Sequence, residues 1–162
     1  TLQQAGADYI VICTNTMHKV APQIQSRISI PLIHIADATA DALENAGVKT
    51  VALLGTKYTM TQDFYKNKLT DRGIRVIVPD EPDIETVNRV IYDELCRGII
   101  SPDSRHAYTE IIGKLKANGA RGVILGCTEI GLLIHQEDSP LPVFDTTVIH
   151  ARKAALLSVR CP

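Results

Sequence analysis

The 162-residue sequence has no excess of charge of one sign, because 17 Lys and Arg face 18 Asp and Glu. This balance argues against a nucleic-acid-binding surface. No apolar run approaches the roughly 18 residues of a membrane span, and no basic segment followed by an apolar stretch marks a signal peptide. These absences predict a globular protein with neither a nucleic acid nor a membrane as partner. Its hydrophobic content of 45% suits a chain that buries an ordinary core.

Cysteine is scarce, since Cys13, Cys96, Cys127 and Cys161 are the four in the chain and no two form a C-x-x-C pair. Such spacing speaks against a disulfide framework and against a zinc ribbon. We therefore expect free thiols in a reducing compartment, the cytoplasm. The five histidines are spread singly, without a pair four residues apart, and predict no metal site. For Cys96 and Cys161 we expect burial as small hydrophobic groups, or simple exposure.

Short apolar runs alternate with longer amphipathic segments along the chain. Strands are predicted at 9–13, 31–35, 51–55, 75–78, 123–126 and 142–144. Helices are predicted between them at 37–46, 62–72, 84–95, from 103 or 104 to 118, and at 148–158. The expected N-caps are Asp37 for the first of these helices and Asp103 or Ser104 for the fourth. The strand segments are too short for helices and rich in branched side chains, whereas most of the helical segments stop at a glycine. This alternation predicts an α/β fold with a parallel sheet covered on both faces.

The sequence also contains a weak internal repeat. Residues 6–14 resemble residues 119–128, since each segment runs from a helix end through a strand to Cys-Thr. Two similar α/β halves are therefore predicted, with Cys13 and Cys127 at the carboxyl ends of parallel strands, where ligands bind in open α/β sheets. A strand from residue 51 opens the second half, whereas only 12 residues precede Cys13. We expect about 60–70 residues of the first half to lie upstream of Thr1, on repeat symmetry.

Paired Cys-Thr turns suit acid–base chemistry. A thiolate accepts a proton near neutral pH once its pKa is lowered, and a strand-to-helix turn offers backbone N–H groups to an anion. Polar side chains follow both cysteines: Thr14, Asn15, Thr16, Thr128 and Glu129. Two thiols on opposite faces of one small molecule can invert a carbon beside a carboxylate, because one takes a proton while the other gives one.

The segments around the two cysteines resemble the two cysteine signatures of the aspartate/glutamate racemase family. Residues 11–18 and 123–131 carry the resemblance, and residues 54–59 are similar to the ligand loop of that family's second half. The match extends from residue 6 to about residue 155. The residues around the two cysteines resemble those of the aspartate racemase branch and the broad-specificity bacterial amino-acid racemases. Glu129 stands where the cell-wall glutamate racemases usually carry histidine, and Thr14 is an insertion that occurs in one branch of the family.

The resemblance implies an isomerase, an amino-acid racemase that needs no pyridoxal phosphate, other cofactor or metal. Its substrate would be aspartate, glutamate or a related small polar amino acid, with Cys13 and Cys127 as the catalytic acid and base. The implied substrate-binding residues are Asn15, Thr16, Thr56, Thr59, Thr128 and Glu129.

The implied fold has two pseudo-symmetric parallel-sheet α/β domains with the site between them, the first domain incomplete. Residues 1–34 plus 142–162 would belong to the first domain and residues 35–141 to the second. A homodimer is expected for the full-length protein.

Two other interpretations stay open. The chain could be a related enzyme that uses cysteine turns for other carbanion chemistry, such as decarboxylation, hydantoin racemisation or cis–trans isomerisation. It could also be a truncated, non-catalytic remnant that lacks the substrate loop of the first domain. The presence of both cysteines favours a racemase, because inversion needs a proton donor on each face of the carbon.

Overall fold

The computed structural model describes residues 1–159, so the tail 160–162 with Cys161 lies outside the described residues. In chain order the elements are β1 (Ile10–Val11), η1 (Thr16–Val20), α1 (Ala21–Gln25), β2 (Leu32–Ile33), α2 (Ile35–Asn45), β3 (Thr50–Gly55), α3 (Lys57–Thr61), α4 (Asp63–Thr70), β4 (Arg75–Ile77), α5 (Glu81–Asp93), η2 (Leu95–Arg97), α6 (Pro102–Ala117), β5 (Val123–Gly126), α7 (Ile130–Leu133), η3 (Gln136–Asp138), β6 (Val143–Asp145) and α8 (Thr146–Ser158). No helix in this described part is both long and apolar enough to cross a membrane.

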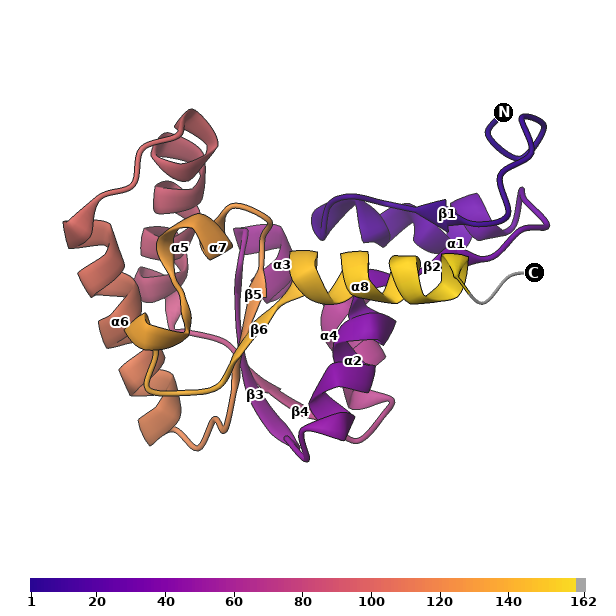
Figure 1. Cartoon of the computed structure of the whole chain (residues 1–162). Helices are drawn as coiled ribbons and strands as arrows, with labels where there is room; N and C mark the ends of the chain where they lie inside the picture. Colours follow the sequence, from indigo (N-terminus) through magenta and orange to yellow (C-terminus); the bar gives the residue numbers. More distant parts are fainter. Residues whose placement is uncertain (160–162) are drawn as a thin grey trace.

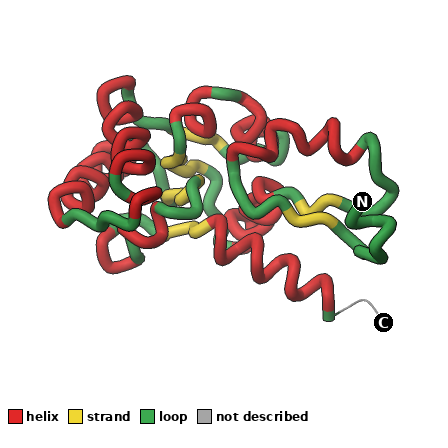
Figure 2. The backbone as a smooth tube through the Cα atoms, turned by 90° about the horizontal axis from the view of Figure 1, so that it is seen from above, coloured by secondary structure: helices red, strands yellow, loops and turns green. Residues whose placement is uncertain are grey.

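The strands form two separate parallel sheets (Figures 1 and 2). The larger sheet has the order β4-β3-β5-β6, and every neighbouring pair is parallel. The smaller sheet pairs β1 with β2, also in parallel. Parallel strands need crossover connections, and helices supply them here. The predicted α/β fold with parallel sheets is confirmed.

Both faces of the larger sheet are buried, which explains why its strands read as continuous apolar runs. Along β3, Ala52 and Leu54 pack with side chains of α5 and α6, while Val51 and Leu53 pack on the other face against α2 and α4. All four side chains are fully buried. Figure 1 shows the two helical layers on opposite sides of the sheet. Because both faces are packed, the sheet holds the loops at its carboxyl ends in fixed positions.

The C-terminal segment connects the two sheets. Strand β6 pairs with β5 in the larger sheet, with Ile124 opposite Phe144, and α8 then packs on α2 and β2. The segment 142–159 thus contacts elements on both sides of the boundaries drawn from the sequence. The division of the chain into two domains stays a prediction.

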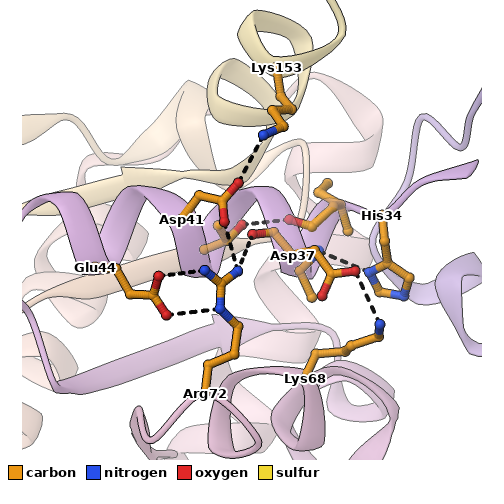
Figure 3. A network of polar contacts seen from close by, with 10 residues as sticks. His34, Asp37, Asp41, Glu44, Lys68, Arg72 and Lys153 are labelled. Carbon is orange, nitrogen blue, oxygen red and sulfur yellow. Dashed lines mark hydrogen bonds and ion pairs between the residues drawn. The ribbon is translucent and has the colours of Figure 1, made fainter. Parts of the chain in front are cut away.

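Ion pairs join α8 and the end of α4 to the exposed side of α2 (Figure 3). Arg72 pairs with Asp41 at 2.7 Å and with Glu44, and Lys153 pairs with Asp41 at 3.0 Å. These side chains are partly exposed, and such pairs typically contribute less than about 1 kcal/mol each. They link α8 and the turn after α4 to α2 and add little to the stability of the apolar core.

Candidate active site at the strand ends

The loop after β1 carries Cys13, and hydrogen bonds of the His18 side chain connect this loop to the start of α2. Cys13 is exposed, whereas His18 is buried. The Nε2 atom of His18 accepts a hydrogen bond from the backbone N–H of Ile35 at 3.1 Å, so the ring proton lies on Nδ1. Nδ1 then donates to the carbonyl oxygen of Thr14 at 2.7 Å. One neutral imidazole therefore ties the cysteine loop to the start of α2.

His18 belongs to a small cluster with His34 and His150, whose ring centroids lie 4.5 and 5.6 Å from that of His18. Burial, and then the neighbouring His18, lower the pKa of His34 to about 4. Burial likewise lowers the pKa of His18. His150 Nε2 lies 2.7 Å from the carbonyl oxygen of Ile33. Within residues 1–159 no group of three or more His, Cys, Asp or Glu side chains is arranged to hold a metal ion.

The second cysteine follows β5 directly. The carboxylate oxygen Oε2 of Glu129 accepts hydrogen bonds from Cys127 Sγ at 2.9 Å and from Thr128 Oγ1 at 2.7 Å. Burial, reinforced by Glu129, raises the pKa of Cys127 to about 12. Burial alone would raise the pKa of Glu129, but the two donated hydrogen bonds outweigh it and the pKa lies below its ordinary value. At neutral pH the pair is therefore a thiol and a carboxylate.

Three threonine hydroxyls connect the segments that follow β1 and β3. Thr16 Oγ1, which opens η1, lies 3.2 Å from Thr56 Oγ1 and 3.4 Å from Thr59 Oγ1. Thr56 is the N-cap of α3, and its hydroxyl oxygen accepts a hydrogen bond from the backbone N–H of Thr59 at 3.3 Å. Hydroxyls from both sheets thus meet in one cluster, and each can donate or accept for a bound polar group.

A second connection runs through Asn15, whose side chain is almost fully buried. Its Nδ2 donates to Thr146 Oγ1 at 3.0 Å, and Thr146 in turn donates to the carbonyl oxygen of Leu125 at 2.7 Å. The Oδ1 atom of Asn15 is buried and has no hydrogen-bond partner in the described part of the chain. A buried acceptor of this kind is costly unless something donates to it.

These loops enclose one cavity of about 390 Å³. It is lined by Cys13, Thr14, Asn15, Thr16, Met17, Thr56, Tyr58, Ile91, Tyr92, Cys96, Gly126, Cys127, Thr128 and Glu129. The residues that line the cavity include every site residue predicted from the sequence except Thr59. Thr59 is fully buried, and its hydroxyl lies within hydrogen-bond distance of those of Thr16 and Thr56. A cavity at the carboxyl ends of parallel strands is the usual ligand position in open α/β sheets.

Four residues that line the cavity, and one that holds a lining residue in place, were not predicted from the sequence. Tyr58, Ile91, Tyr92 and Cys96 come from α3, α5 and η2 and also line the cavity. Cys96 is exposed, although no role was predicted for it. Thr146 links Asn15 to β5. The one sequence signal for Thr146 is its place directly after a strand, at the first turn of a helix.

A parallel sheet with helices on both faces, and a cavity at the strand ends, define the chain as an α/β protein of the open-sheet class, in which ligands bind at this position. The identity within that class comes from the sequence family. Residues 1–154 match the model of the family described as Asp/Glu/Hydantoin racemase. The chain belongs to this family.

Individual proteins named as racemases, or as homologues of racemases, are similar to this chain. The broad specificity amino-acid racemase RacX of Bacillus subtilis (strain 168) is 25% identical over 155 residues, which cover 93% of this chain and 65% of that protein. A candidate Asp/Glu racemase from Yersinia pestis is 55% identical, with a TM-score of 0.93 over 98% of this chain and 70% of that one. An aspartate racemase homologue from Pyrococcus horikoshii OT3 is 39% identical, with a TM-score of 0.89 and the same coverage. The chain thus spans about two thirds of the length of these relatives.

Proposed function

We propose that the whole protein is a cofactor-independent racemase that inverts Cα of aspartate, glutamate or a related small polar amino acid. The observation that carries the proposal is the placement of Cys13 and Cys127 in one cavity, each after a strand of a different sheet. Membership of the racemase family supports it. The proposal includes a small-molecule amino-acid substrate and, for the whole protein, a cytoplasmic location and a homodimer.

The chemistry needs a base on one face of Cα and an acid on the other. In one direction Cys13 as thiolate removes the Cα proton, and the thiol of Cys127 donates a proton to the opposite face. In the other direction the two cysteines exchange roles. Inversion, unlike decarboxylation, uses a proton carrier on both faces, and this favours a racemase over other carbanion enzymes.

The surrounding groups have roles that follow from their hydrogen bonds. Asn15, Thr16 and Thr56 hold the substrate carboxylate and ammonium, and Thr128, whose one hydroxyl proton goes to Glu129, accepts from the ammonium. Glu129 holds the thiol proton of Cys127 in a defined direction at 2.9 Å. A substrate ammonium beside Glu129 offsets the negative charge that raises the pKa of Cys127. Substrate binding therefore lowers the cost of the thiolate when Cys127 must act as the base.

The test is exchange of the Cα hydrogen in D₂O, followed by NMR with the whole protein and no added cofactor. We expect loss of the Cα–H signal from both enantiomers of the same amino acid. Because enantiomers have equal free energies, kcat/KM should be the same in the two directions. Exchange that disappears after removal of pyridoxal phosphate, or no exchange with any amino acid, would contradict the proposal.

A further inference from the structure

Thr146 lies where the chain passes from β6 into α8, and it is fully buried. Capping of the helix is left to Asp145, whose carboxylate accepts from the backbone N–H groups of Thr147 and Val148 at 2.8 and 3.3 Å. Strand β6 is paired with β5 up to Asp145, which lies in register with Leu125. Thr146 is therefore the first residue past the paired strands, and α8 runs from it toward the smaller sheet (Figure 1).

The Thr146 hydroxyl makes two hydrogen bonds, and its single proton fixes the direction of both. It donates to the carbonyl oxygen of Leu125 at 2.7 Å, because a carbonyl can only accept. The side chain of Asn15, at 3.0 Å, must then donate to the hydroxyl through Nδ2. The orientation of the Asn15 amide follows from this one hydroxyl. Both side chains are buried, where hydrogen bonds are stronger than in water.

These two hydrogen bonds join the segments that carry the two cysteines. Asn15 comes two residues after Cys13, in the loop that follows β1 of the smaller sheet. Leu125 comes two residues before Cys127, in β5 of the larger sheet. Within residues 1–159 the two sheets have no strand pair in common. Helix packing and side-chain contacts of this kind must therefore place the two cysteine segments relative to each other.

We propose that Thr146 is a positioning residue of the racemase: its hydroxyl fixes the Asn15 amide and holds the Cys13 segment against the strand that ends before Cys127. This inference rests on the proposed function and adds a residue that acts from outside the cavity lining in the described part of the chain. Inversion needs one thiol on each face of Cα at a set separation, and a misplacement of about 1 Å can lower a rate by about 10²-fold.

Two substitutions separate the hydroxyl of Thr146 from its shape. Thr146→Val keeps the branched side chain and removes both hydrogen bonds, whereas Thr146→Ser keeps the hydroxyl and removes the methyl group. Cα–H exchange in D₂O is measured with the whole protein over a range of substrate concentrations. We expect kcat to fall about tenfold or more in Thr146→Val and to stay within about threefold of the wild type in Thr146→Ser. A role in packing alone would give the opposite order.

The matched control is Thr39→Val in α2. The Thr39 hydroxyl is also fully buried, donates to the carbonyl oxygen of Ile35 at 2.8 Å and accepts from the hydroxyl of Tyr65 at 3.2 Å. This substitution removes the same kinds of hydrogen bond outside the two cysteine segments, so the melting temperature of Thr39→Val reports their general cost to stability. We expect its kcat to stay within about threefold of the wild type.

Three results would overturn the positioning role and leave the racemase proposal intact. They are wild-type kcat in a folded Thr146→Val, an equal loss of kcat in Thr39→Val, and a loss in Thr146→Ser as large as in Thr146→Val. A change confined to KM would overturn it as well, because displaced thiols must slow the chemical step. If Thr146→Val does not fold, Thr146→Ala removes the same hydroxyl and gives the same test. No exchange by the wild type with any amino acid would instead refute the racemase function, and this inference with it.

Discussion

Replacing Cys127 by serine is expected to lower the rate of Cα–H exchange by about 10³-fold or more, the range for loss of a general acid–base group. A serine hydroxyl is far less acidic than a thiol and does not form the base that the proposal needs. The same substitution at Cys13 should have an effect of similar size, because the two cysteines act on opposite faces of one carbon. The measurement is exchange in D₂O for each variant, with circular dichroism to show that the fold is retained.

Activity within a few-fold of the wild type in either Cys13→Ser or Cys127→Ser would exclude that cysteine as an acid–base group. A loss that accompanies unfolding would say nothing about catalysis, so Cys→Ala variants with retained melting temperatures serve as the second set.

Gly126→Ala is expected to destabilise the protein by about 3 kcal/mol, at the upper end of overpacking effects. Gly126 pairs in register with Gly55 at the carboxyl ends of the two central strands. A Cβ on Gly126 would lie 2.8 Å from the carbonyl oxygen of Leu54 and 2.9 Å from Leu53 Cδ1. Because the first contact is backbone, the strands must separate just before Cys127. The measurement is chemical denaturation monitored by circular dichroism.

Gly113→Ala is the matched control for this prediction. Gly113 lies inside α6, and a Cβ built there has no heavy atom within 4 Å. Alanine should therefore stabilise the protein by about 0.5–1 kcal/mol, the ordinary helix-propensity difference. If Gly126→Ala were as stable as the wild type, the tight packing of β3 against β5 would be wrong.

The central strands and the approximate helices could be predicted from the sequence because their signals are local. The strand predicted at 123–126 coincides with β5, and that at 51–55 lies within β3. Helix starts were less accurate. Asp37 was expected to cap α2, but the helix begins at Ile35, and the Nδ1 atom of His34 accepts from the backbone N–H of Ala36 at 3.2 Å. Propensity favours Asp as a cap, whereas here the histidine fits the turn.

Two other differences have similar causes. Asp103 or Ser104 was predicted to cap α6, but Ser101 does so, because Pro102 is favoured at the first helical position and moves the start toward the N-terminus. Residues 54–59 resemble a ligand loop, and the last three of them begin the short helix α3, Lys57–Thr61. Five residues carry too little periodicity to be recognised as a helix.

The expected positions of Cys13 and Cys127 followed from one rule, that ligands bind at the carboxyl ends of parallel strands, whereas Thr56 and Thr59 came from the family resemblance. That rule indicated the loops of Cys13 and Cys127 but not their connections. Asn15 and Thr146, which share a hydrogen bond, are 131 residues apart. His18 accepts its hydrogen bond from Ile35, at the start of α2. The place of Tyr92 and Cys96 in the cavity lining also depends on how α5 ends. Such contacts are determined by tertiary packing, so the pattern of neighbouring residues in the sequence does not predict them.

The isotopic composition of the product at low conversion tests most directly whether two groups act on opposite faces of Cα. A protiated L-amino acid is converted in D₂O, and both enantiomers are separated and analysed by mass spectrometry. We predict a D-product fully deuterated at Cα beside a remaining L-substrate that still carries its original hydrogen. A product that keeps the hydrogen of the substrate, or deuterium that enters the remaining substrate as fast as it enters the product, would mean that a single base serves both faces.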